Sequence, residues 1–267
     1  MILANRYKLE EQIGKGSFGV ICKGKNIRTN KLIAIKIESI ENTKRALKNE
    51  AKLYQYLGNI EGFVNIKWFG VCNKHTYMVM DLLGDSLTKY KQNTPIDIIQ
   101  YQIKNIGKQM IRRIEVLHKH GLIHRDIKPD NFIFGLSDKE DILYLIDLGM
   151  CKNHLLFINK EINGKTNDII GTPIYVSLFV NKNGEPSRRD DIESVLYILL
   201  YLMDKLEWIH LIENNSEIIN QIIKYKENII YNSNISLIII DLITYCRNLE
   251  FNECPDYTFI YSKLELL

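Results

Sequence analysis

Apolar and polar residues alternate in several short runs near the N-terminus, a pattern typical of half-buried β-strands. The pattern predicts five strands that form one antiparallel sheet, at 7–13, 20–24, 32–37, 66–71 and 76–80. Between the third and fourth strands, apolar side chains recur at helical spacing over 43–57. The first part of the chain is therefore expected to be a small sheet with one helix.

The remainder of the chain is mainly helical in pattern. A helical region is expected from Ser86, and residues 96–120 carry a long apolar stripe. Very apolar helices are predicted at 192–203 and 235–249. A strand over 143–149 interrupts them and ends in an acidic residue, then a glycine. The fold class is therefore α+β, in which a sheet-rich part precedes a larger helical part.

Composition narrows the class of protein. The chain has 267 residues, 46% of them hydrophobic, which is enough for a substantial core. A net charge of +3 is too weak to indicate a nucleic-acid partner. The five cysteines form no C-x-x-C pair, which favours reduced thiols in an intracellular protein of the cytoplasm or nucleus. The first residues lack a signal-peptide core, and the longest apolar run, 194–203, is too short for a membrane span. We expect a monomer that does not enter the membrane.

A glycine-rich turn joins the first two predicted strands. Gly14, Gly16 and Gly19 would let the backbone approach phosphate groups without interference from Cβ atoms. A dinucleotide-binding fold would need a helix after these glycines, and a strand follows instead. An ordinary hairpin remains the alternative, because glycine also serves simple turns.

A single lysine stands in the apolar third strand. Lys36 could lie on the solvent face, as is usual for half-buried strands, or it could bind phosphate. The second interpretation requires an acidic partner on the next helix. Glu50 lies in the middle of the helix predicted at 43–57 and is the candidate.

A polar loop at 124–131 lies between two apolar runs, and Pro129 excludes a regular helix there. It carries Asp126, Lys128 and Asn131, followed by Asp147 at the end of the strand predicted at 143–149. This spacing fits the H-R-D and D-F-G motifs of protein kinases.

Longer segments resemble the casein kinase 1 group of protein kinases almost end to end. The similarity is carried by 78–87, 124–132, 187–194 and 255–257. It implies one bilobal kinase domain over 1–267, with an N-lobe at about 1–80, a hinge at 81–85 and a C-lobe at 86–267. It also implies transfer of the γ-phosphoryl group of ATP, with Mg²⁺, to Ser or Thr of protein substrates.

The resemblance also assigns roles. Asp126 would accept the hydroxyl proton and Lys128 would reach the γ-phosphate, while Asn131 and Asp147 would hold Mg²⁺. Lys36, oriented by Glu50, would neutralise phosphate charge. The remaining nucleotide-binding candidates are Ile13, Gly14, Lys15, Gly16, Ser17, Phe18, Gly19, Val20, Ile21, Ala34, Met80, Leu83 and Ile146.

The chain departs from the family at two positions. Leu148 replaces the Phe of D-F-G and can fill the same apolar pocket. Ile174 stands where casein kinase 1 proteins usually have an arginine that binds a substrate phosphate, which argues against selectivity for phosphate-primed substrates. Three cations could favour acidic substrates, although single surface cations are usually just solvated: Arg188, Lys224 and Lys226.

Regulation and two acidic residues complete the predictions. Thr166 is the main phosphorylatable residue of the segment 150–170, so we expect activity without phosphorylation there. Asp190 or Asp191 could bond back to the catalytic loop, or could cap the helix that follows.

Two other functions stay open. One is a catalytically weak, pseudokinase-like scaffold. Pseudokinases usually lack the lysine, the loop aspartate or the metal-binding aspartate, but Lys36, Asp126 and Asp147 are all present here. The other is a small-molecule phosphotransferase of similar fold. A zinc site at His118, His120 and Cys151 fits no known ligand spacing.

Overall fold

The computed structural model describes all residues except 17–18, 41–45, 155–168 and 214. The chain divides into two compact units, each described separately below. The first comprises 1–85 and 133–150, and the second comprises 86–132 and 151–267. The chain thus leaves the first unit, re-enters it for one short segment, and ends in the second.

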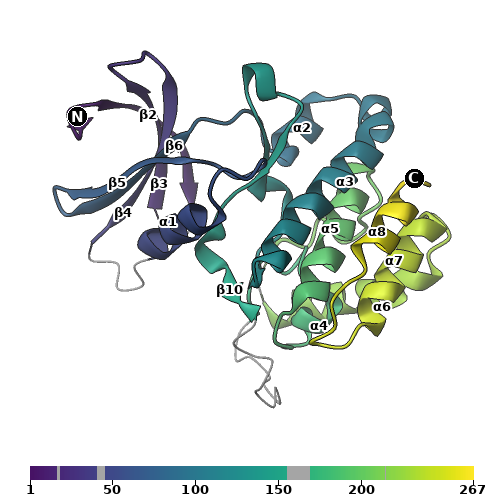
Figure 1. Ribbon diagram of the computed structural model, residues 1–267. Coiled ribbons are helices and arrows are strands. Elements are labelled where there is room, and N and C mark those ends of the chain that lie inside the picture. The colour runs from purple at the N-terminus through teal and green to yellow at the C-terminus, as the bar shows by residue number, and fades with distance from the viewer. Residues whose placement is uncertain (17–18, 41–45, 155–168, 214) are drawn as a thin grey trace. The chain divides into compact units, whose positions relative to one another are not determined.

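The first unit is built on one antiparallel sheet (Figure 1). Six strands lie in the order β1-β2-β3-β4-β6-β5. The prediction of five strands was wrong because a two-residue edge strand is too short to show alternation. The strands are β1 (Ile2–Leu3), β2 (Tyr7–Gly16), β3 (Gly19–Asn26), β4 (Leu32–Ser39), β5 (Ile66–Cys72) and β6 (His75–Asp81).

The two faces of this sheet have different roles. Successive side chains of a strand point to opposite faces. On one face, alternate residues of β4 and β6, such as Ile35 and Val79, form a core cluster with Leu3 of β1 and Tyr7 of β2. On the other face, helix α1 (Ala46–Leu57) packs against the sheet. That second face also carries Lys36.

A short segment completes the first unit. Strand β8 (Phe132–Phe134) pairs with β9 (Leu143–Leu145), and a 3-10 turn, η2 (Ser137–Lys139), lies between them. The strand predicted over 143–149 ends early, because Asp147 adopts a left-handed conformation (φ 62°) and η3 (Leu148–Met150) follows. The chain therefore turns at Asp147 and fixes its carboxylate beside α1.

The second unit is a helical bundle around α5. Nearly every side chain of α5 is buried. Helices α3 and α7 pack on α5, and α8 packs on both α3 and α7 (Figure 1). The helices are α2 (Leu87–Asn93), α3 (Ile96–Lys119), α4 (Leu178–Asn181), α5 (Arg188–Leu202), α6 (Ser216–Asn228), α7 (Leu237–Asn248) and α8 (Tyr257–Leu264).

Local signals define the start of α5 and the loop before it. Ser187 and Asp190 form a capping box, so α5 begins at Arg188 rather than at 192 as predicted. Strand β7 (Leu122–Ile123) pairs with β10 (Lys152–Asn153), and the 3-10 turn η1 (Pro129–Asn131) follows β7. These short elements hold the loop at 124–131 at both ends. No helix among the described residues is both long and apolar enough to cross a membrane.

Candidate active site

Lys36 is the centre of the chemistry in the first unit. Its ammonium lies 2.8 Å from a carboxylate oxygen of Glu50 on α1 and 2.8 Å from one of Asp147. Both Lys36 and Glu50 are buried. Of the two interpretations of this lysine, the structure excludes the solvent-exposed one. It joins three residues that the sequence analysis selected separately.

Burial and charge act in opposite directions within this cluster. Burial alone would lower the pKa of Lys36, but the carboxylates of Glu50 and Asp147 outweigh it and raise the pKa above its ordinary value. Burial raises the pKa of Glu50 to about 7, against the opposing attraction of Lys36. The ammonium of Lys36 therefore stays charged at neutral pH, while the carboxyl group of Glu50 titrates near neutral pH.

Helix α1 also fixes Asp147. The hydroxyl of Tyr54, one turn after Glu50, accepts a hydrogen bond of 3.1 Å from the backbone N–H of Asp147. A left-handed conformation costs a non-glycine residue of order 1–3 kcal/mol, so such a backbone needs support from its surroundings. Tyr54 supplies part of this support, and the sequence analysis did not select it.

Three of the predicted nucleotide-binding residues, Ile21, Ala34 and Met80, lie on the Lys36 face of the sheet. Residues opposite one another in an antiparallel pair share a face. Ile21 pairs with Lys36, and Ala34 pairs with Met80. Ala34 and Met80 are buried, whereas Ile13 is half exposed. Leu83 and Ile146, the other two candidates in this unit, are partly buried.

The glycine turn is a hairpin in which Gly14 pairs with Ile21, Lys15 with Val20, and Gly16 with Gly19. A Cβ at Gly19 would overlap the carbonyl oxygen of Ile37, so this glycine is required for packing against β4. At Gly14 a Cβ would make only ordinary contact with Ile21. The glycines thus have different roles, while the predicted contacts of Ser17 and Phe18 lie outside the described residues.

Asp126 is the centre of the chemistry in the second unit, and it is buried. One carboxylate oxygen accepts a hydrogen bond of 2.8 Å from the hydroxyl of Thr172. The other lies 2.7 Å from the ammonium of Lys128. The side-chain amide of Asn131 donates to the backbone carbonyl of Asp126 at 2.8 Å. The first two contacts orient the carboxylate, and the third holds the backbone of the loop.

Asp191 fixes the backbone of this loop from α5. Its buried carboxylate accepts hydrogen bonds from the backbone N–H groups of His124 (2.7 Å) and Arg125 (2.9 Å). His118 Nε2 lies 3.0 Å from the same carboxylate. Arg125 is left-handed (φ 70°), so it too needs support. Both interpretations of the two aspartates hold: Asp191 bonds back to the loop, and Asp190 caps the helix.

The residues predicted to hold a metal have suitable chemistry. The amide nitrogen of Asn131 donates to Asp126, which leaves the amide oxygen as a potential ligand. Asp147 supplies a carboxylate. Hard cations such as Mg²⁺ prefer these oxygen donors. Each of these two side chains therefore offers a ligand of the kind that a divalent metal prefers.

Three functional features were missed or misjudged from the sequence. The sequence analysis assigned no role to Thr172. Lys226 was treated as a surface cation, which was wrong because its side chain is completely buried. Glu185 was not considered, although it pairs with Lys152 at 3.0 Å and attracts the guanidinium of Arg125. Partners distant in sequence create all three features.

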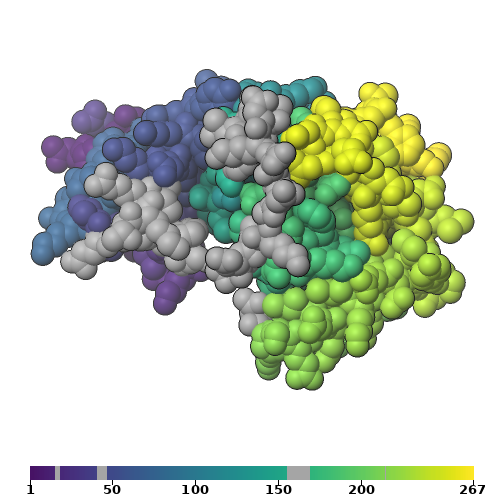
Figure 2. Space-filling view, turned by 90° about the horizontal axis from the view of Figure 1, so that it is seen from below, coloured from purple at the N-terminus to yellow at the C-terminus, as the bar shows by residue number. Residues whose placement is uncertain are grey.

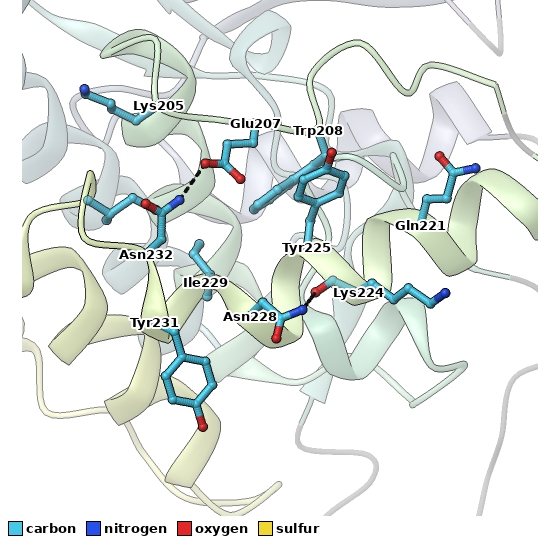
Figure 3. Close-up of a pocket in the computed structure, with 11 residues that line it drawn as sticks. Lys205, Glu207, Trp208, Gln221, Lys224, Tyr225, Asn228, Ile229, Tyr231 and Asn232 are labelled. Carbon is cyan, nitrogen blue, oxygen red and sulfur yellow. Dashed lines mark hydrogen bonds between the residues drawn. The ribbon is translucent and has the colours of Figure 1, made fainter.

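A separate pocket of about 640 Å³ lies on the second unit (Figure 3). Trp208 and Tyr225 lie side by side in it, and Glu207 accepts a hydrogen bond from Asn232. The lining contains none of the predicted catalytic residues; it is formed by Lys205, Glu207, Trp208, Gln221, Lys224, Tyr225, Asn228, Ile229, Tyr231, Asn232 and Ile235.

The two clusters together define a class of protein. A lysine paired with a helix glutamate, a metal-binding aspartate, and a loop with an aspartate, a lysine and an asparagine are the residues of an ATP-dependent phosphotransferase. A family model described as protein kinase domain matches residues 7–258, so the chain belongs to the protein kinase family. Membership supports phosphotransferase activity, and it implies ATP, a divalent metal and protein substrates.

Proposed function

We propose that the protein is a serine/threonine protein kinase that uses Mg²⁺-ATP. The arrangement around Asp126 carries this proposal. Its carboxylate is held between the hydroxyl of Thr172 and the ammonium of Lys128, inside a rigid loop. A carboxylate fixed in this way can orient a substrate hydroxyl and accept its proton.

The other residues have roles that follow from their charges. Lys36, held by Glu50, would neutralise phosphate charge. Asn131 and Asp147 would hold Mg²⁺, which supplies charge neutralisation on the transferred phosphoryl group when bound. Lys128 would interact with the γ-phosphate. Catalysis in this proposal is positioning together with electrostatic stabilisation.

Selectivity for Ser and Thr is supported by two residues. In the casein kinase 1 group, which this chain resembles, a lysine two positions after the catalytic aspartate accompanies Ser/Thr specificity, and Lys128 stands there. Thr172 occupies one oxygen of Asp126 by a hydrogen bond within the same unit. We therefore expect small aliphatic hydroxyls to be phosphorylated in preference to the tyrosine phenol.

The structure also bears on substrate choice. Ile174 is buried, and its carbonyl accepts a hydrogen bond of 2.9 Å from Trp208 Nε1. No cation is therefore present at this position to bind a substrate phosphate. We propose that the enzyme acts on unprimed substrates, with at most a modest preference for acidic ones through exposed cations such as Lys224.

The test is phosphorylation of matched peptides with labelled ATP and Mg²⁺. Peptides identical except for Ser, Thr or Tyr at the acceptor position test selectivity, and a phosphoserine placed upstream tests priming. We expect Ser and Thr peptides to be labelled, with no gain from priming. Lys36→Met and Asp126→Asn should each reduce the rate about 100-fold or more. Nucleotide binding without any transfer would instead support the scaffold alternative.

A further inference from the structure

Lys226 is a cation without a solvent-exposed surface. It lies on α6, and its side chain is completely buried. An isolated buried ammonium is very costly, so such a group is retained only with full compensation. Lys226 is therefore expected to hold partners that matter to the fold or to the chemistry.

The partners belong to the segment that follows Thr172. The ammonium donates to the backbone carbonyls of Pro173 (3.0 Å) and Val176 (2.6 Å), and to the side-chain oxygen of Asn181 (2.6 Å). An ammonium has three N–H donors, so these three acceptors use all of them. Two of the three are backbone groups of 172–176, defined here as the acceptor loop.

Two aromatic rings enclose the same charge. The ammonium lies 4.7 Å from the ring centre of Tyr197 and 5.6 Å from that of Trp208. Cation–π attraction of this kind favours the charged form, although burial lowers the pKa of Lys226. Trp208 also donates to the carbonyl of Ile174, so a third carbonyl of the acceptor loop is bound from the same side.

A short path leads from Lys226 to the catalytic aspartate. The carbonyl of Thr172 accepts hydrogen bonds from the backbone N–H groups of Tyr175 (2.9 Å) and Val176 (3.1 Å), which makes the acceptor loop one compact turn. Lys226 holds the carbonyl at the end of this turn. The hydroxyl of Thr172, at its beginning, bonds Asp126 at 2.8 Å.

The packing of α4 against α6 supports a link from Lys226 to the acceptor loop. Helix α4, directly after the acceptor loop, contacts α6. The green surface that includes α4 borders the yellow-green surface that includes α6 (Figure 2). Asn181 of α4 also donates to the carbonyl of Pro173 at 3.2 Å, so Lys226 and Asn181 share one acceptor. The acceptor loop is thus bound to α6 at several points.

We propose that Lys226 is a positioning residue for phosphotransfer, which holds the acceptor loop so that Thr172 orients Asp126 toward the substrate hydroxyl. The proposal rests on the proposed kinase function. Every contact in this path lies within the second unit. The proposal therefore predicts a structural effect that can be measured without activity: the acceptor loop loosens when Lys226 is replaced.

The experiment compares Lys226→Met, Lys226→Arg and Trp208→Phe with the wild-type chain. Met removes all three donors while keeping much of the volume, Arg keeps several N–H donors, and Phe removes the bond to Ile174 while keeping an aromatic ring. Kinetics for a Ser peptide and for ATP are measured separately, and hydrogen exchange is followed over peptides that span 171–181. Lys119→Met, which removes an exposed lysine of α3 in the same unit, is the matched control.

Lys226→Met should reduce kcat/KM for the peptide about 100-fold with little change in KM for ATP, since a small misplacement of a catalytic group has such an effect. Hydrogen exchange over 171–181 should rise. Lys226→Arg should have a kcat/KM for the peptide at least about tenfold higher than that of Lys226→Met. Trp208→Phe should lower kcat/KM for the peptide by less than Lys226→Met does.

Three results would overturn the proposal. They are unchanged exchange over 171–181 in Lys226→Met, an equal loss in the Lys119→Met control, and a rise in KM for ATP as large as that for the peptide. If Met fails to fold, Arg and Trp208→Phe still decide, because each keeps most of the buried contacts. Should the wild-type chain transfer no phosphate, the kinase function fails, whereas the exchange result still judges the role of Lys226.

Discussion

Replacement of Asp191 by asparagine gives the sharpest test of how the catalytic loop is held. The carboxylate accepts from the N–H groups of His124 and Arg125 and from His118, and it is almost inaccessible to solvent. An asparagine side chain keeps one acceptor oxygen, but its NH₂ group would face other donors. The change therefore leaves buried donors without partners while the volume stays the same.

The magnitude follows from these contacts. Removing one partner of a buried charged network costs about 3–5 kcal/mol. The total stability of a folded domain is about 5–15 kcal/mol, so the loss is a large fraction. At about 2–4 °C per kcal/mol for a unit of this size, the unfolding midpoint should fall by roughly 6–20 °C. Because Arg125 loses support for its left-handed backbone, activity should fall about 100-fold as well.

Thermal unfolding followed by circular dichroism measures the first effect, and peptide phosphorylation at a temperature where the variant is folded measures the second. The matched control is Asp241→Asn, an exposed carboxylate 2.8 Å from Lys263, which should cost less than about 1 kcal/mol. An Asp191→Asn protein that unfolds like the control, or that is folded and fully active, would refute the reasoning.

The pH dependence has a defined sign for this residue. Burial would raise the pKa of Asp191, but its hydrogen bonds with His118 and the amide of His124 outweigh burial and lower it. A carboxylate with a lowered pKa in the folded state contributes stability above its unfolded value, 3.8, and that contribution is lost as pH falls. The Asn variant should therefore lose stability at neutral pH and differ less from wild type in strong acid.

Three further outcomes are expected. Because the pKa of Glu50 is about 7, kcat/KM should rise with pH through about 7 as its pair with Lys36 becomes fully ionised, and this limb should vanish in Glu50→Gln; an unchanged limb would contradict the assignment. Thr172→Val keeps the shape but removes the donor to Asp126, so kcat should fall about tenfold with KM for ATP unchanged, as steady-state kinetics would show. His154 is buried, its ring nitrogens lack hydrogen-bond partners among the described residues, and burial lowers its pKa to about 4. Stability should therefore be lost as pH falls from about 6.5 to 4. His154→Phe should make unfolding midpoints less dependent on pH over that range, and an equally steep dependence would contradict this.

The sequence predicted those elements whose signals are local. Strands β3, β4 and β6 are short runs rich in apolar residues, and α3 shows a long apolar stripe, so each was found within a few residues. Helices α4 and α8 were missed because they are short. Helix α6 was also missed, although it has an apolar face and is capped by Asn215. Boundaries shifted where a cap decides them, as at the start of α5.

The candidate site was predictable to the extent that it is a motif. Lys36, Glu50 and Asp147 were selected by residue type and spacing, and the structure joins them. The contacts of Tyr54 with Asp147 and of Thr172 with Asp126 join residues far apart in the chain. No periodicity reports such pairs, because they depend on how separate elements pack.

Lys226 shows why residue type alone misleads. Lysine is rarely buried, so a lysine on an amphipathic helix is normally assigned to the solvent face. Here the cost of burial is offset by three oxygen acceptors from 173–181 and two aromatic rings, all of which come from other elements. The same contacts that make the burial possible bind the backbone of the acceptor loop. A buried lysine whose three donors are all bonded therefore indicates a segment whose position is fixed, and in this chain that segment carries the hydroxyl of Thr172 to Asp126.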